Sequence, residues 1–119
     1  MRVACPWFEP QAEMDGPRPA RTPLGSLFTG VCHAGDQVRV PPEHLLREPC
    51  NFGYGRRVCP HFPPQSEADA VRFSTRKGRL IWILEKDYAP LSHGLCDDAM
   101  PKEHMQRQAD VAKQRWLTT

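Results

Sequence analysis

The sequence predicts a small α+β protein: a loop-rich N-terminal half around a four-cysteine metal site, an antiparallel β-hairpin or meander, and one C-terminal helix. Three observations predict this class. Four cysteines lie singly among the prolines and glycines of the first half of the chain: Cys5, Cys32, Cys50 and Cys59. Alternating apolar and polar residues then flank a Lys-Gly pair, and the chain ends with apolar residues at helical spacing.

The N-terminal half is expected to contain little regular structure, because eleven of the 13 prolines and six of the eight glycines precede residue 65. Residues 9–22 are polar and interrupted by prolines, which predicts a mobile loop. Residues 24–33 and 37–40 predict two short strands, and Ala34-Gly35-Asp36 predicts the turn between them.

A short helix is expected over residues 41–48, since proline suits the first turn of a helix and Pro49 is expected to end it. Residues 51–57, with two glycines, predict a tight bend or a single helical turn that leads to Cys59. The helix expected over residues 41–48 would then direct Cys50 toward the metal site.

The C-terminal half is expected to be regular. Residues 70–75 alternate, Lys77-Gly78 offers a two-residue turn, and residues 80–84 form an apolar run, which together predict a hairpin. A third strand around residues 91–96, after a break at Pro90, would complete a meander. Residues 101–117 predict a helix whose apolar stripe packs on the sheet. The stripe consists of Met105, Ala109, Ala112 and Trp116.

Length and charge narrow the class of protein. At 119 residues one domain is expected, with residues 1–65 as the cysteine-bearing half and residues 66–119 as the meander and helix. The net charge of +2 creates no field that would attract nucleic acid, and no apolar run predicts a membrane span. Without a signal-peptide pattern the chain is expected to be cytoplasmic, where thiols serve metals more often than disulfides.

The four cysteines are interpreted as the ligands of an iron–sulfur cluster of the [4Fe-4S] type. They are separated by 26, 17 and 8 residues, whereas structural zinc usually takes cysteines in closely spaced pairs. Each iron of a cluster takes its own thiolate, so the ligands can come from distant loops. Zinc in a stapled module that binds a partner protein is the alternative, and inert or disulfide-bonded cysteines are the third interpretation.

A cluster in this chain would serve electron transfer, redox sensing or structural support, with a protein partner and no identified small-molecule substrate. Side chains near the cysteines in sequence are expected to surround the site, and a histidine could replace one thiolate. These side chains are His33, His61, Trp7 and Tyr54.

No catalytic residue is assigned, and a protein without enzymatic activity is expected. The sequence contains no phosphate-binding loop, dinucleotide fingerprint, H-E-x-x-H or G-x-S-x-G motif. Cys96, with His93 three residues earlier, could be imagined as a nucleophile and its base, but no third group accompanies them. A buried strand thiol is the favoured interpretation of Cys96.

The motifs Cys-Pro-x-Phe-x-Pro, Gly-x-Cys-His and Cys-Asn-x-Gly-Tyr are followed by a further cysteine, by Asp69-Ala70-Val71-Arg72-Phe73 and by His93-Gly94. This order resembles that of a set of short, uncharacterised bacterial proteins, over most of the chain from Cys5 to His93. The resemblance implies that the four-cysteine layout is a family design, and it implies no activity.

Overall fold

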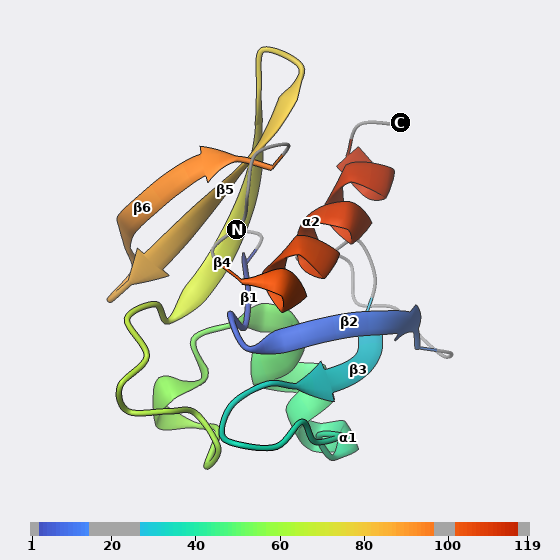
Figure 1. Ribbon diagram of the computed structural model, residues 1–119, viewed down its shortest axis with the longest axis vertical. Helices are drawn as coiled ribbons and strands as arrows, with labels where there is room; N and C mark the ends of the chain where they lie inside the picture. Colours follow the sequence, from blue (N-terminus) through green and yellow to red (C-terminus); the bar gives the residue numbers. More distant parts are fainter. Residues whose placement is uncertain (1–2, 15–26, 97–101, 117–119) are drawn as a thin grey trace.

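The computed structural model describes residues 3–14, 27–96 and 102–116, and it has the expected α+β class (Figure 1). A four-stranded antiparallel sheet has the order β1-β4-β5-β6, and β2 and β3 form a separate antiparallel pair. The strands span Val3–Ala4 (β1), Phe8–Glu13 (β2), Phe28–Cys32 (β3), Ala70–Arg76 (β4), Arg79–Lys86 (β5) and Ala89–Leu95 (β6).

The predicted meander is confirmed. Lys77 and Gly78 both have positive φ, as a two-residue turn between strands of right-handed twist requires. Asp87 and Tyr88 make the second turn with positive φ although neither is glycine. The expected break at Pro90 is wrong, because Pro90 lies inside β6; the strand tolerates it at the sheet edge, beside a register irregularity in β5.

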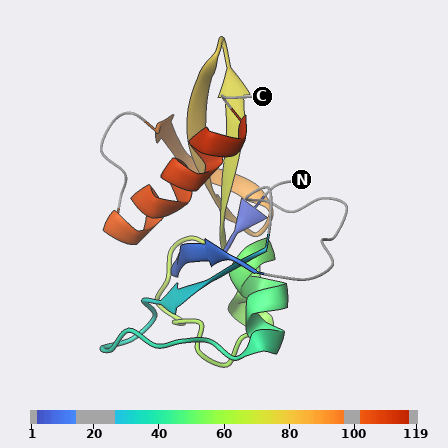
Figure 2. The same cartoon turned by 90° about the vertical axis from the view of Figure 1, so that its right-hand side faces the viewer.

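The C-terminal helix, α2 (Glu103–Trp116), is also confirmed. Its residues Met105, Ala109 and Ala112 are buried, whereas the side chain of Trp116 lies outside the described residues. The helix packs mainly against β2 and also touches β4 and β5 (Figures 1 and 2). Within the described ranges, no helix has the length and apolar character needed to cross a bilayer.

The N-terminal half is more ordered than expected. The expected loop over residues 9–22 is wrong at its start, because β2 covers Phe8–Glu13 and pairs with β3; residues 15–26 lie outside the described residues. β2 accommodates Pro10 because this two-stranded sheet leaves one edge of the strand unpaired and its register shifts at that point. The strand expected over residues 24–33 appears as β3, Phe28–Cys32. The strand expected over residues 37–40 is reduced to a single bridge between Arg39 and Cys32.

The short helix expected over residues 41–48 begins only at Glu43, with Pro42 as its N-cap, and it does not end at Pro49. α1 (Glu43–Leu45) continues into a widened π-helical turn, η1 (Leu46–Cys50), and Pro49 lies inside that turn. Proline lacks an N–H and its ring collides with the carbonyl four residues earlier in an ordinary α-helix, and a π turn relieves this conflict. The bend expected over residues 51–57 contains a 3₁₀ turn, η2 (Gly55–Arg57).

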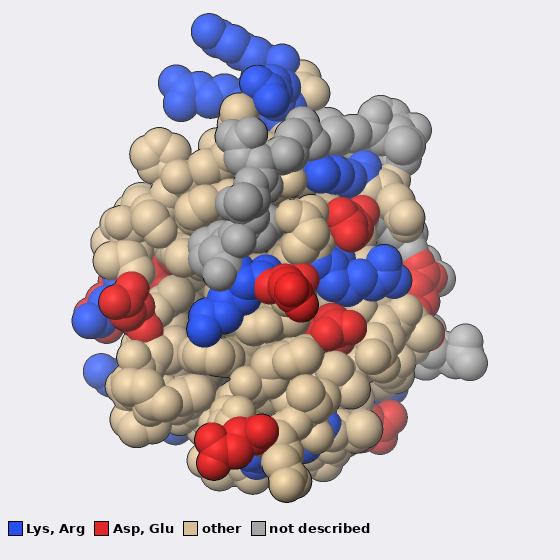
Figure 3. Space-filling view, viewed as in Figure 1, with Lys and Arg blue, Asp and Glu red and all other residues tan. Residues whose placement is uncertain are grey.

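The surface has a mixed charge pattern with one basic projection. Arg76, Lys77 and Arg79 are exposed at the β4–β5 turn, and blue side chains project from that end of the molecule (Figure 3). Elsewhere on this face acidic and basic side chains are interspersed, as the small net charge leads one to expect.

Candidate metal centre

Four separate segments carry the four cysteines. Cys5 follows β1, Cys32 ends β3, Cys50 ends η1, and Cys59 follows η2. All four line one small cavity, together with Trp7, Phe8, Ala34, Pro49, His61 and Phe62. None of the four forms a disulfide, and Cys59 is the only one of them that is not classed as buried. The fold therefore brings together thiols that are up to 54 residues apart in the sequence (59 − 5 = 54).

The thiols are close enough to influence one another electrostatically. Burial raises the pKa of the Cys5 thiol well above its ordinary value, and the other three thiols raise it further. Burial also raises the pKa of Cys50 to about 12, and Cys32 and Cys59 add to that effect. The pKa of Cys32 is likewise raised, by burial first and also by Cys59. Each of the six pairs among the four thiols thus contributes repulsion, which a bound cation would relieve.

Two backbone amides point at the sulfurs. The N–H of Ala34 donates to Cys32 Sγ at 3.4 Å, and the N–H of Trp7 donates to Cys5 and lowers its pKa against the effect of burial. In both cases the donor lies two residues after the cysteine. Such N–H···S bonds stabilise the thiolate form, which is the form that binds metal.

Asn51 ties the strand that carries Cys32 to the helical segment that carries Cys50. Its side chain is fully buried. Its Oδ1 accepts the N–H of Phe28 at 3.0 Å, and its Nδ2 donates to the carbonyls of Phe28 at 3.0 Å and Leu46 at 2.5 Å. One amide side chain therefore satisfies three buried backbone groups and fixes two of the cysteine-bearing elements relative to each other.

Helix α2 holds the segment that carries Cys5. Nε2 of the fully buried Gln108 donates to the carbonyls of Cys5 at 2.7 Å and Phe8 at 2.5 Å. One turn earlier, Nε2 of His104 donates to the carbonyl of Pro6 at 2.8 Å. The backbone of Cys5 also donates to the carbonyl of Cys50 at 3.3 Å. Sequence reasoning missed Asn51 and this polar row on α2; the spacing of His104 and Gln108, four residues apart beside the apolar stripe, was the available signal.

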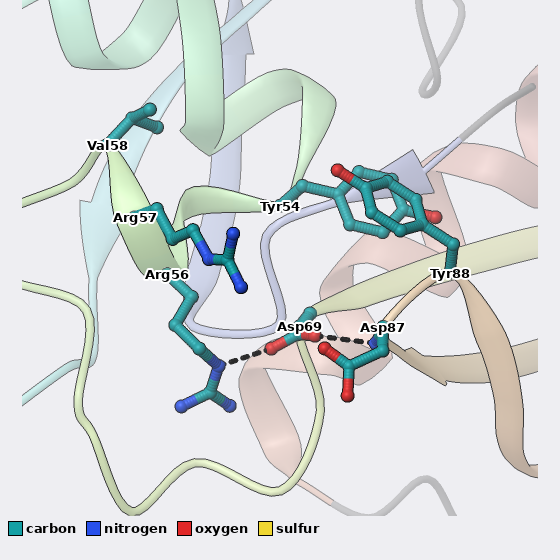
Figure 4. Close-up of a pocket in the computed structure, with 7 residues that line it drawn as sticks. All are labelled: Tyr54, Arg56, Arg57, Val58, Asp69, Asp87 and Tyr88. Atoms are coloured by element: carbon teal, nitrogen blue, oxygen red, sulfur yellow. Dashed lines mark hydrogen bonds and ion pairs between the residues drawn. The ribbon is translucent and has the colours of Figure 1, made fainter.

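The segment that leads to Cys59 is anchored to the large sheet. The Tyr54 hydroxyl donates to Glu85 of β5. Arg56 Nε lies 2.6 Å from Asp69, just before β4 (Figure 4). Burial alone would raise the pKa of Asp69, but bonds from the Asp87 N–H and from Arg56 outweigh it and lower that pKa. Burial and the bond to Glu85 raise the pKa of Tyr54. Tyr54, Arg56 and Asp69 line a second cavity, with a volume of about 330 Å³. Side chains around this cavity thus position the loop before Cys59.

The side chains expected around the cysteines divide into two groups. Trp7 and His61 line the four-cysteine cavity, and His61 also receives a hydrogen bond from Arg39. His33 instead bonds Glu9 at 2.7 Å and stacks on His104 with ring centroids 4.6 Å apart. Tyr54 lines the second cavity and stacks on Tyr88. Both of these side chains act away from the thiols.

The Cys96–His93 pair does not form a catalytic arrangement. Cys96 is 1 % exposed, so its expected burial is confirmed, but it lies just after the end of β6 rather than in the strand; His93 is exposed on β6. His93 therefore does not provide a base that is shielded from solvent together with the Cys96 thiol.

Comparison with known proteins identifies no relative: no family model, curated protein or solved structure matches this chain.

Proposed function

We propose that this chain is a non-catalytic iron–sulfur protein that binds a [4Fe-4S] cluster through Cys5, Cys32, Cys50 and Cys59. The observation that supports it is the convergence of the four thiols, from four separate elements, on one cavity. Cysteine thiolates are the standard ligands of such clusters, which supply one-electron transfer when bound. The cavity also suits a cluster because its walls between the sulfurs are largely apolar and include the rings of Phe8 and Phe62, which would exclude water.

The sequence spacing of the cysteines favours a cluster over a single ion, because structural zinc usually takes cysteines in closely spaced pairs. Thiolates around one tetrahedral zinc lie about 3.8 Å apart, as follows from a Zn–S bond of about 2.3 Å. Among the described residues, no three His, Cys, Asp or Glu side chains are grouped so that they could hold one metal ion, although the four thiols share a cavity. In a cluster each cysteine binds a different iron, so its ligands are not required to surround a single ion.

The size of the cavity favours the alternative, a zinc-stapled module that binds a partner protein. The free space between the side chains is about 10 Å³, which is room for about one water-sized particle. A cluster would need the thiols and rings to move outward to make room for its iron and sulfide atoms. We favour the cluster because the cysteines are not paired in sequence.

Either metal would hold the N-terminal half together, because its ligands come from β1, β3, η1 and η2. Electron transfer or redox sensing would be additional to that structural role and would require a protein partner in the cytoplasm. Cys59 is half-buried, whereas the other three proposed ligands are buried. We therefore expect electrons to be exchanged on the side of the cluster where Cys59 lies.

Metal analysis tests the proposal. After anaerobic purification we expect about four irons and four acid-labile sulfides per chain, with a brown colour; one zinc per chain without sulfide would establish the alternative, and a metal-free folded chain would refute both. Single Cys→Ser changes at Cys5, Cys32, Cys50 or Cys59 should each remove the metal. Cys96→Ala is the matched control and should retain it, since Cys96 does not line the cavity.

A further inference from the structure

A third concave site lies beside the four-cysteine cavity. Its volume is about 340 Å³, it opens to solvent, and it is lined by the Pro6-Trp7 turn, residues 65–68, Leu84 of β5 and the start of α2. The lining includes one carboxylate, that of the exposed Glu67. This volume falls within the usual range of small-molecule sites. Its apolar wall is formed by side chains that are themselves nearly buried: Ala68, Leu84 and Met105.

Trp7 forms a wall of both cavities, because it lines this site and also the four-cysteine cavity. Its Nε1–H donates to Ser66 Oγ at 3.0 Å, and Ser66 Oγ donates to the carbonyl of Ala68 at 2.8 Å. The indole therefore has a fixed orientation. A molecule held against it would be separated from the four thiols by one aromatic side chain.

Lys102 supplies a positive charge at this site. Its ammonium lies 4.9 Å from the centroid of the Trp7 ring, and its side chain is exposed. It has no carboxylate partner within the part of the chain that the structure describes. A cation–π contact at an exposed position contributes only about 0.5–1 kcal/mol, so the ammonium remains available to an oxygen of a ligand.

We propose that this cavity binds a small planar aromatic molecule of the quinone class, with its ring against Trp7 and a carbonyl or anionic oxygen at Lys102. The flat indole and the apolar wall select a planar apolar ring, and the ammonium selects an electron-rich oxygen. The choice of a redox-active ring rests on the proposed function, because Trp7 is shared with the metal centre. Binding itself does not depend on which metal the cysteines hold.

Isothermal titration calorimetry on the purified, metal-loaded chain tests this inference, with anthraquinone-2-sulfonate as the probe. Its fused rings block addition of cysteine thiols to the quinone. We expect saturable binding of one probe per chain. Lys102→Gln should weaken that binding about 10-fold, near the lower end of the range for a hydrogen bond to a charged group, because the ammonium is exposed. Lys77→Gln removes the same charge at the distant β4–β5 turn and should leave the dissociation constant unchanged.

Three outcomes would overturn the inference: no saturable binding, equal effects of the two lysine changes, or equally tight binding of octanesulfonate, an aliphatic anion. Anthracene-2-sulfonate separates the ligand classes. If it binds as tightly as the quinone, a planar-anion site is established and the quinone class is wrong. A zinc-loaded chain that still binds the quinone through Lys102 would support the cavity while refuting the proposed iron–sulfur function, so the two failures are distinguishable.

Discussion

Replacing Asn51 with alanine should destabilise the protein by about 3–5 kcal/mol. The side chain is fully buried and makes three hydrogen bonds to the backbone of Phe28 and Leu46. Each bond contributes about 1 kcal/mol net, and a buried group left without its partner costs about 1–3 kcal/mol. The sum is a large share of the roughly 5–15 kcal/mol by which domains are stable.

Urea denaturation followed by circular dichroism, at equal metal loading, measures this loss. Gln37→Ala, which changes an exposed amide in the loop after β3, is the control and should change the stability by less than about 0.5 kcal/mol. Asn51→Leu restores the volume without the hydrogen bonds, so it should cost nearly as much as Asn51→Ala. If Asn51→Ala costs under about 1 kcal/mol, or if Asn51→Leu restores the stability, the hydrogen-bonding argument is wrong.

Three further predictions concern other contacts. Gly30→Ala should prevent β2–β3 pairing and metal retention, because the new Cβ would lie 2.0 Å from the backbone oxygen of Glu9. Gly78→Ala is the control: its Cβ would meet no atom within 4 Å, so it should cost only about 1 kcal/mol, which comes from its positive φ. Thermal denaturation compares the stabilities of the two variants. Gln108→Met should cost about 2–4 kcal/mol and speed metal loss to a chelator, since two carbonyls lose their donor; unchanged release would contradict this. Burial lowers the pKa of His104 below its ordinary value of 6.5, with smaller effects of its neighbours, so the unfolded chain binds the proton first and stability should fall as pH decreases below 6.5. His104→Gln should flatten that pH dependence in denaturation curves between pH 5 and 8, a range set by the titration of histidine.

The elements that could be predicted from sequence depend on local patterns. The meander follows from the alternation in β4 and the Lys77-Gly78 turn, and α2 follows from the spacing of its buried alanines. β2 was missed because Pro10 argues against a strand, and only pairing with β3 explains its tolerance. The continuation of the helix past Pro49 was missed because a π turn has no distinct sequence signature.

The cysteines of the candidate site could be named from the sequence, because each neighbours a residue suited to a turn. The groups that hold their segments could not, since Asn51 acts across 23 residues and Gln108 across about 100. Contacts of that range depend on tertiary packing, which no local pattern reports. Trp7 was named as a neighbour of the cysteines, but its second role as a wall of another cavity appears only in three dimensions.

The bond between Gln108 and the carbonyl of Cys5 has a consequence for biosynthesis. Among the four proposed ligands Cys5 is translated first, and its carbonyl is held by a residue that follows it by 103 positions in the chain. The segment of Cys5 therefore gains this restraint only after α2 has emerged and docked. Under the proposed function, loading of the metal should follow that step, and the thiols of the growing chain depend on the reducing power of their surroundings until then.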